Sequence, residues 1–260
     1  MIEPRYSLDE PNLDAIDAVE MLLANDSPNE EIIEFIRQLK APEQLYQPDY
    51  RLKEKLKEFS EWYETGTKKP NISNKQLGER MEEISYLVFS CLKDVNSFKS
   101  FNSPDSQLDL VISIDRKSFV VQKLLALQGD RIIVEAKNTQ GRLGVKEFSR
   151  LCSILHYKYE AQSNLGIIFA PKGATGFPKQ GQPRQKKLSD ARLIQALYHA
   201  KTQKYILVFD YQDIIRLGEP GSLFKIIEAK QHDVADVSGI DLYDENLDER
   251  DDLPPHLSRL

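Results

Sequence analysis

Short apolar runs alternate with helical patterns in the second half of the chain. Residues 165–170 and 204–209 are almost wholly apolar, which is typical of strands buried on both faces. Residues 145–157 and 188–200 instead repeat apolar side chains every three or four positions, which predicts helices. Because each helix precedes a buried strand, we expect helical crossovers between strands of one sheet.

The segment before these crossovers predicts one long helix and three more strands. Ser73 is a helix N-cap with Gln76 three residues later, at the head of an apolar stripe. Strands follow near 96–101, 107–114 and 131–136. After the last core strand, Asp210 caps a short helix and residues 219–230 add another. The predicted fold class is therefore α/β, with a mixed central sheet flanked by helices.

The two ends of the chain differ in pattern from this central domain, which we assign to residues 73–230. Residues 1–72 predict helices at 12–24, 28–39 and 50–63 before a linker at 66–74, and form an N-terminal helical accessory region. Residues 231–260 are acidic, contain two adjacent prolines and lack periodicity, so disorder is expected. Alternatively, this tail lies on a basic surface or a partner as a phosphate mimic.

The net charge of −6 conceals a basic centre. Residues 1–72 carry 16 acids and 9 bases, and residues 231–260 carry 9 acids and 2 bases, so each end has a net charge of −7. The remaining residues, 73–230, carry 24 bases and 16 acids, a net charge of +8. The central domain is therefore basic enough to attract a polyanion such as DNA.

Composition favours a cytoplasmic protein with no membrane partner. The longest apolar runs are far shorter than the roughly 18 residues of a membrane span, and the first residues lack the layout of a signal peptide. Cys91 and Cys152 both fall inside apolar helical patterns. We interpret them as free thiols in a reducing compartment, the alternative being a disulfide or a metal pair.

Three charged residues occur in two of the apolar strand segments, where charge is costly. Asp109 lies within the predicted strand at 107–114, and Glu135 and Lys137 are two apart on the next strand, so both project from one face. Two carboxylates with the carbonyl of Ala136 offer the oxygen ligands that Mg²⁺ prefers, with Mn²⁺ as an alternative. A bound metal polarises a phosphoryl group, and Lys137 can orient the attacking water. This pattern predicts metal-dependent hydrolysis of a phosphodiester.

The same three residues have a simpler interpretation. A Glu-x-Lys sequence on an exposed strand is common, and by itself it indicates only a solvated surface. The apolar flanks of both segments favour burial, however, and none of the four histidines has the spacing of zinc ligands.

Four segments together resemble the PD-(D/E)xK nuclease superfamily, and within it the Mrr-like restriction endonuclease domain. The opening helix at 78–83 resembles the family's Gly-x-x-Phe-Glu helix, and residues 134–139 with Gly144 resemble its core strand and following helix. Residues 163–169 with the loop at 173–176, and 205–210 with Asp213, resemble its later strands. The likeness covers roughly 73–218 and implies a restriction-endonuclease-like sheet.

The resemblance also implies roles for individual residues. Glu82 falls where the family places a further acid near the metal, although Glu79 or Glu83 could take its place, or Glu82 could be a solvated charge on an amphipathic helix. The chain departs from the family in having Leu108, where proline is common, before Asp109. The long gap from Asp109 to Glu135 requires an insertion at 115–130.

Basic residues suggest how a nucleic acid is held. The loop at 171–187 has no acid and five bases, which could track a phosphate backbone or simply be solvated: Lys172, Lys179, Arg184, Lys186 and Lys187. Arg142 and Lys146 follow the Glu-x-Lys strand and are candidates for gripping the scissile strand. No recognition helix or zinc knuckle is evident, so sequence-specific readout is not indicated.

We therefore predict a Mg²⁺-dependent endonuclease acting on double-stranded DNA. Because each site cuts one strand, a homodimer is expected, and the resemblance implies restriction or phage defence, with DNA repair as an alternative. Two rivals remain. The fold could be a binding module that no longer cleaves, or a subunit whose N-terminal helices dock on a protein partner.

Overall fold

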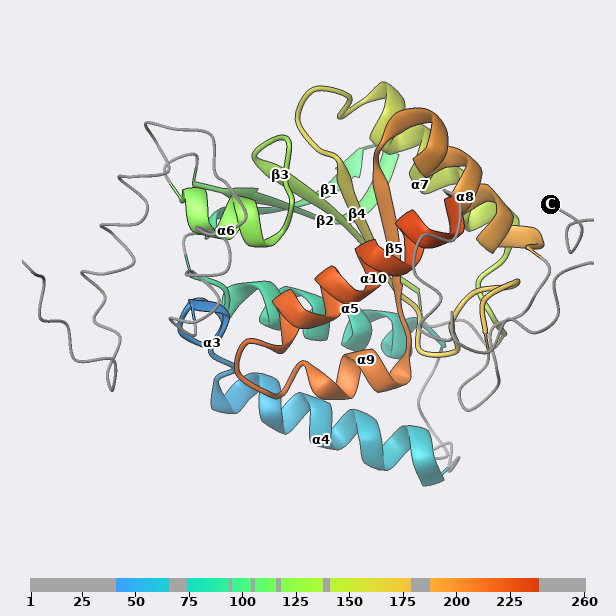
Figure 1. The fold of residues 1–260 in the computed structure, drawn as a ribbon. Coiled ribbons are helices and arrows are strands. Elements are labelled where there is room, and N and C mark those ends of the chain that lie inside the picture. The colour runs from blue at the N-terminus through green and yellow to red at the C-terminus, as the bar shows by residue number, and fades with distance from the viewer. Residues whose placement is uncertain are drawn as a thin grey trace, which may run out of the picture.

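The computed structural model describes residues 41–65, 74–93, 95–103, 106–115, 118–137, 141–178 and 188–238. The predicted helices at 12–24 and 28–39, the linker up to residue 73 and the acidic residues from 239 onward lie outside the described residues. The described part of the chain contains a five-stranded sheet with helices on both faces (Figure 1).

The sheet is mixed, as the sequence predicts. Its strands lie side by side in chain order and are β1 (Val95–Ser103), β2 (Ser106–Ile114), β3 (Arg131–Ala136), β4 (Leu165–Phe169) and β5 (Tyr205–Phe209). β1 pairs antiparallel with β2 and β2 with β3, whereas β3, β4 and β5 run parallel to one another. The carboxyl ends of these three strands therefore meet at one edge of the sheet, which is where the candidate site lies.

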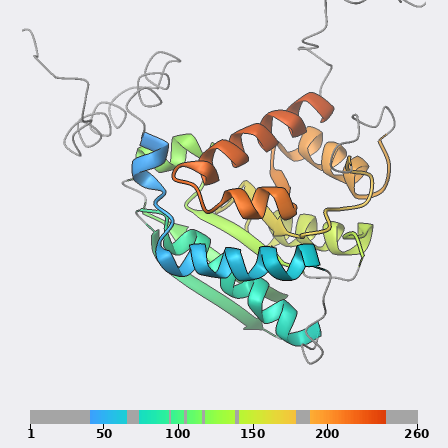
Figure 2. The same ribbon diagram turned by 90° about the horizontal axis from the view of Figure 1, so that it is seen from below.

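Helices cover the two faces of the sheet. They are α3 (Ala41–Leu45), α4 (Tyr50–Thr65), α5 (Asn74–Ser90), α6 (Phe119–Leu124), α7 (Val145–Tyr157), α8 (Asp190–Thr202), α9 (Tyr211–Arg216) and α10 (Ser222–Ser238). The crossovers between parallel strands, α7 and α8, pack on one face, and α5, α9 and α10 on the other (Figures 1 and 2). The insertion expected between β2 and β3 contains α6.

Alternation along the strands divides the core between these two layers. Ile133 and Ile168 pack with the buried side chains of α7 and α8, whereas Val134 and Ile167 pack with those of α5, α9 and α10. Every position of β4 is buried, as is every position of β3 after the first. The continuous apolar runs in the sequence therefore reflect strands covered on both faces.

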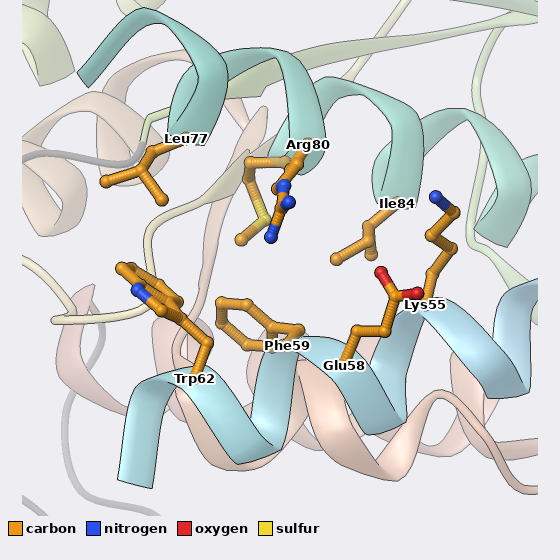
Figure 3. A pocket seen from close by; sticks show the side chains of 8 residues that line it. Lys55, Glu58, Phe59, Trp62, Leu77, Arg80 and Ile84 are labelled. Carbon is orange, nitrogen blue, oxygen red and sulfur yellow. The ribbon is translucent and has the colours of Figure 1, made fainter. Parts of the chain in front are cut away.

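Helix α4 belongs to the same hydrophobic core as the sheet. Leu52, Leu56 and Phe59 are buried in the cluster that includes α5 and α9, and Figure 3 shows Phe59 and Trp62 facing the α5 side chains. The 41–65 segment of the predicted accessory region therefore packs as part of the central unit. The predicted boundary at 72/73 stays a prediction, because residues 1–40 are not described.

Helix α10 extends beyond the predicted start of the disordered tail. Gln231 donates a hydrogen bond to the carbonyl of Leu125 (3.0 Å), and Val234 is buried in the core. Expecting disorder from 231 was therefore wrong for residues 231–238. Because the segment is rich in acidic residues, its helical stripe was not identified from the sequence. In this stripe Ile227, Gln231 and Val234 recur at helical spacing.

Two expectations from composition can be compared with the described residues. Both cysteines are free thiols, Cys152 buried and Cys91 half-buried, as interpreted from the sequence, and the reducing compartment stays a prediction. Among the described helices, none is sufficiently long and apolar to span a bilayer.

Candidate active site

The pairing of β2 with β3 stops just before the candidate site. Leu110 and Val134 are the last paired residues, whereas β3 stays paired with β4 up to Ala136. Asp109 and Glu135 would be the next facing residues, and facing residues of an antiparallel pair project from the same side of the sheet. Asp109 and Glu135 are thus directed to the face covered by α7, and Lys137 shares it because it lies two residues beyond Glu135.

A register shift in the neighbouring pair accompanies this divergence. On the outer side of β2, Lys99 pairs with Val111 and Phe101 with Leu108, so two residues of β2 lie opposite one residue of β1. Asp109 is one of these two residues. Such β-bulges bend a strand and redirect side chains, and they are frequent next to active sites.

Asp109 bonds to the backbone of the neighbouring strand. Its Oδ2 accepts a hydrogen bond from the Ala136 N–H (2.7 Å). The Asp109 side chain thus takes the position that a β2 carbonyl would have in regular strand pairing. Because the N–H and C=O of one strand residue point toward the same neighbouring strand, the Ala136 carbonyl is also directed to the Asp109 side. The carboxylate and the carbonyl thus share one gap between the diverging strands.

Glu135 and Lys137 complete the predicted cluster. Lys137 Nζ lies 2.7 Å from Glu135 Oε1 and 3.7 Å from Asp109 Oδ2. Glu135 is only 4% exposed, whereas Lys137 remains partly open to solvent. The convergence of the three side chains expected from the strand pattern is therefore observed, and their catalytic roles stay predictions.

A fourth side chain, Arg150, was not predicted from the sequence. It extends from the middle of α7, and its Nη1 donates a hydrogen bond to Glu135 Oε1 (2.5 Å), the oxygen that Lys137 also contacts. From the sequence, Arg150 is only a polar residue within a predicted helix. The signal that could have found it is that the helix following β3 covers the sheet face on which Glu135 lies.

The two oxygens of Glu135 have different surroundings. Oε1 contacts both cations, whereas Oε2 is buried and accepts no hydrogen bond from the described residues. A buried carboxylate oxygen without a partner costs free energy comparable to a lost hydrogen bond to a charged group, about 1–3 kcal/mol or more. Such a difference between the two oxygens is expected of a carboxylate whose second oxygen binds a metal cation.

Charge neighbours set the ionisation of Lys137. Burial lowers its pKa, but the hydrogen bond to Glu135 and the negative charges of Glu135 and Asp109 outweigh burial, so the net shift is upward. Lys137 is therefore a cation at neutral pH. It can orient a water or a phosphate oxygen, but it cannot accept a proton.

Glu82 lies on α5, which packs on the face of the sheet opposite to α7. Its side chain is exposed, yet partial burial of the carboxyl group raises its pKa, and the charges of Asp109 and Glu135 raise it further while Lys137 partly offsets them. The predicted role of Glu82 as a further acid near a metal stays a prediction. No direct bond from Glu82 to the cluster is present among the described contacts.

The donors at this site suit a hard cation that keeps most of its water. Two carboxylates and the Ala136 carbonyl match a Mg²⁺ ion with one or two protein carboxylates and several waters. Within the described ranges, no group of three or more His, Cys, Asp or Glu side chains is close enough to share an ion. Further ligands would therefore be waters and substrate phosphate oxygens.

Those predicted DNA-contacting residues that the structure describes lie at the same edge of the sheet. Arg142 donates a hydrogen bond to the carbonyl of Phe177 (2.7 Å), and Lys146 and Lys172 are exposed on α7 and the loop after β4. Arg142 is therefore partly committed to holding the loop. Lys179, Arg184, Lys186 and Lys187 lie outside the described residues.

Comparison with known proteins adds no family to this geometry. No protein-family model, curated protein or solved structure matches the chain. The functional argument therefore depends on the site itself.

Proposed function

We propose that this protein is a Mg²⁺-dependent endonuclease with a restriction-endonuclease-like fold, acting on double-stranded DNA. The observation that carries the proposal is the arrangement around Glu135: a buried carboxylate with one oxygen held by two cations and the other without a partner, beside Asp109. The order helix, three antiparallel strands, helix and parallel strand supports the fold assignment. The +8 charge of residues 73–230 supports a polyanionic substrate.

The residues have separate roles in the proposed reaction. Asp109, Glu135 and the Ala136 carbonyl would hold the metal, which when bound supplies Lewis acidity and lowers the pKa of a coordinated water. Lys137 would orient the attacking water and would offset the negative charge that develops on the phosphoryl oxygens. Because Lys137 stays protonated, the proton of the attacking water would pass to solvent or to the substrate phosphate, and a solvent water would protonate the leaving oxygen. Glu82 would add negative charge near the cluster.

Two copies of the chain would cut the two strands, so we expect a homodimer on DNA. A role in restriction, phage defence or repair follows from the resemblance of the motifs. The non-cleaving alternative would have to explain why a buried acid is retained where a bound phosphate would repel it.

The proposed activity is tested by incubating the purified chain with supercoiled plasmid and with a labelled linear duplex. Mg²⁺ or Mn²⁺ should produce nicked and then linear plasmid, and a chelator should abolish both products. Retained DNA binding with no cleavage of duplex, single-stranded DNA or RNA under either metal would contradict the enzyme and favour the binding module.

Arg150→Met is expected to weaken activity without abolishing it. Loss of the guanidinium removes one of the two groups that hold Glu135 Oε1, so the carboxylate can rotate and the metal affinity falls. Such supporting contacts are typically worth about 10–100-fold in metal affinity or activity. Cleavage rates measured over a range of Mg²⁺ concentrations should show an increased requirement for metal.

The matched control is Arg216→Met, which removes an exposed guanidinium on α9. It should leave the metal requirement unchanged. An Arg150→Met variant with wild-type metal dependence would show that Arg150 does not position Glu135.

A further inference from the structure

A pocket lies at the sheet edge that carries the candidate site. Its volume is about 530 Å³, and it opens where β4 and β5 end, between the segments that begin at Pro171 and Asp210. In open sheets with parallel strands, ligands bind outside the carboxyl ends of the strands. The volume is within the range of about 300–1,000 Å³ found for small-molecule sites.

The pocket has aromatic walls fixed by hydrogen bonds. The rings of Tyr63 and Tyr211 stack with centroids 4.1 Å apart and planes 10° apart. The Tyr63 hydroxyl donates to the Pro171 carbonyl (3.3 Å), and the Tyr211 hydroxyl is 2.9 Å from that of Ser60. Phe177 lies on the lining as well, with the Arg192 guanidinium 4.9 Å from its ring centroid. These contacts cover one face of each ring, so a flat ligand would pack against the edges and faces that they leave open.

The polar lining has two chemical characters. Arg142 and Lys172 bring positive charge, and Arg142 is held in place by its bond to the Phe177 carbonyl. Asp210, Gln212 and Asp233 bring side-chain oxygens. Asp210 already accepts the N–H groups of Gln212 and Asp213, and Asp233 is paired with Arg192 (2.7 Å). Because a carboxylate has about four lone-pair sites, both aspartates can accept further hydrogen bonds. The third cation of the lining, Lys230, is paired with Asp213 (2.7 Å). A ligand that matches this lining has an anionic group, a flat aromatic body and N–H donors on its edge.

We infer that this pocket binds one nucleotide, with the phosphate at Arg142 and Lys172 and the base against the aromatic walls. Amino and imino groups on the base edge would donate to the acidic side chains, as in proteins that hold an unstacked base. The inference rests on the proposed function, because a nuclease site explains why a nucleic-acid strand reaches this edge.

Backbone geometry connects the pocket with the candidate site. The Lys137 N–H donates to the carbonyl of Phe169 (2.8 Å), and Pro171, which lines the pocket, is two residues further along. The pocket over β4 and β5 and the cluster on β3 are separated by about two strand spacings, roughly 10 Å. A single strand can therefore place one nucleotide in the pocket and a neighbouring phosphodiester at Glu135.

Trp62 provides a reporter for binding. It is the sole tryptophan of the chain, and its ring centroid lies 6.4 Å from that of Tyr63. Titration of the metal-free protein with the four deoxynucleoside 5′-monophosphates should change its fluorescence saturably. Inorganic phosphate and deoxyribose 5-phosphate should bind at least about tenfold more weakly, because they lack the stacking base. Equal affinity for phosphate and nucleotides, or no saturable binding, would overturn the inference.

Substitutions identify the pocket as the binding site. Lys172→Ala should raise the nucleotide dissociation constant about tenfold, the value of a hydrogen bond to a charged group. Lys201→Ala, which removes an exposed lysine on α8, should leave it unchanged. Because Lys172 is exposed, its removal does not threaten folding. A wild-type dissociation constant in Lys172→Ala would place the nucleotide elsewhere.

The two proposals can fail independently. Glu135→Gln should bind nucleotides as the wild type does while losing cleavage. Nucleotide binding without metal-dependent cleavage in the wild type would contradict the nuclease and leave the pocket standing. Cleavage without nucleotide binding would contradict the pocket alone.

Discussion

Glu135→Gln should reduce Mg²⁺-dependent DNA cleavage by at least about a thousandfold, because it removes the charge of the buried metal ligand. A metal that stabilises transition-state charge is worth several kcal/mol, and each 1.36 kcal/mol is a factor of ten in rate. Glutamine keeps the size of the side chain and an acceptor for Lys137 and Arg150. Single-turnover cleavage of a labelled duplex at saturating protein measures the effect.

The control for this variant is Glu219→Gln, which neutralises an exposed acid between α9 and α10. It should cleave at the wild-type rate. Circular dichroism and the melting temperature establish that Glu135→Gln folds. Cleavage by a folded Glu135→Gln within tenfold of wild type would remove Glu135 from the site.

Lys137→Met should lower the cleavage rate by about 10²–10³-fold, the usual cost of losing one donor that stabilises a transition state. DNA affinity measured without metal should change much less. Lys137→Arg should recover part of the activity, because it restores the charge in a different geometry. Lys123→Met, on the exposed surface of α6, is the matched control.

The pH dependence distinguishes a cationic role from a general base. The pKa of Lys137 is raised above its ordinary value of 10.5, so the stability from its ion pairs is fully present below that value and is lost as the pH rises through the raised pKa. The melting-temperature difference between wild type and Lys137→Met should therefore be constant from pH 7 to about 10. A wild-type cleavage rate that rises with a pKa assigned to Lys137 near neutrality would contradict this role.

Much of the fold could be predicted because its signals are local. The continuous apolar run of β4 and the helical stripe of α7 each identify an element without knowledge of its partners. Asp210 was predicted as a helix cap, and its side chain accepts the N–H groups of Gln212 and Asp213. Such patterns depend on residues close in sequence, which is why they were identified correctly.

Other features of the fold depend on contacts distant in sequence. The packing of α4 into the core involves Phe59 and Tyr211, more than a hundred residues apart. The helical stripe that extends α10 to residue 238 includes the buried Gln231. A pattern of apolar residues does not identify this position, because glutamine is polar. Such pairings are decided by the tertiary fold and not by the local pattern.

The candidate site was predictable for a similar reason. Glu135 and Lys137 share a face because of strand periodicity, and apolar flanks indicated that Asp109 lies on a neighbouring strand. The bulge at Asp109 and the bond from Arg150 were not predictable, since both depend on register and on the docking of α7. The sequence thus indicated which acids meet, and the structure adds how Glu135 is held.

The most direct test of the central claim is anomalous diffraction from crystals soaked in Mn²⁺. We predict one ion between Asp109 and Glu135, about 2.0–2.3 Å from Glu135 Oε2 and from an Asp109 oxygen, with waters completing an octahedron. The claim that these carboxylates form a metal centre would be contradicted by a saturating soak with no anomalous peak at this position, whether or not an ion binds elsewhere in the chain.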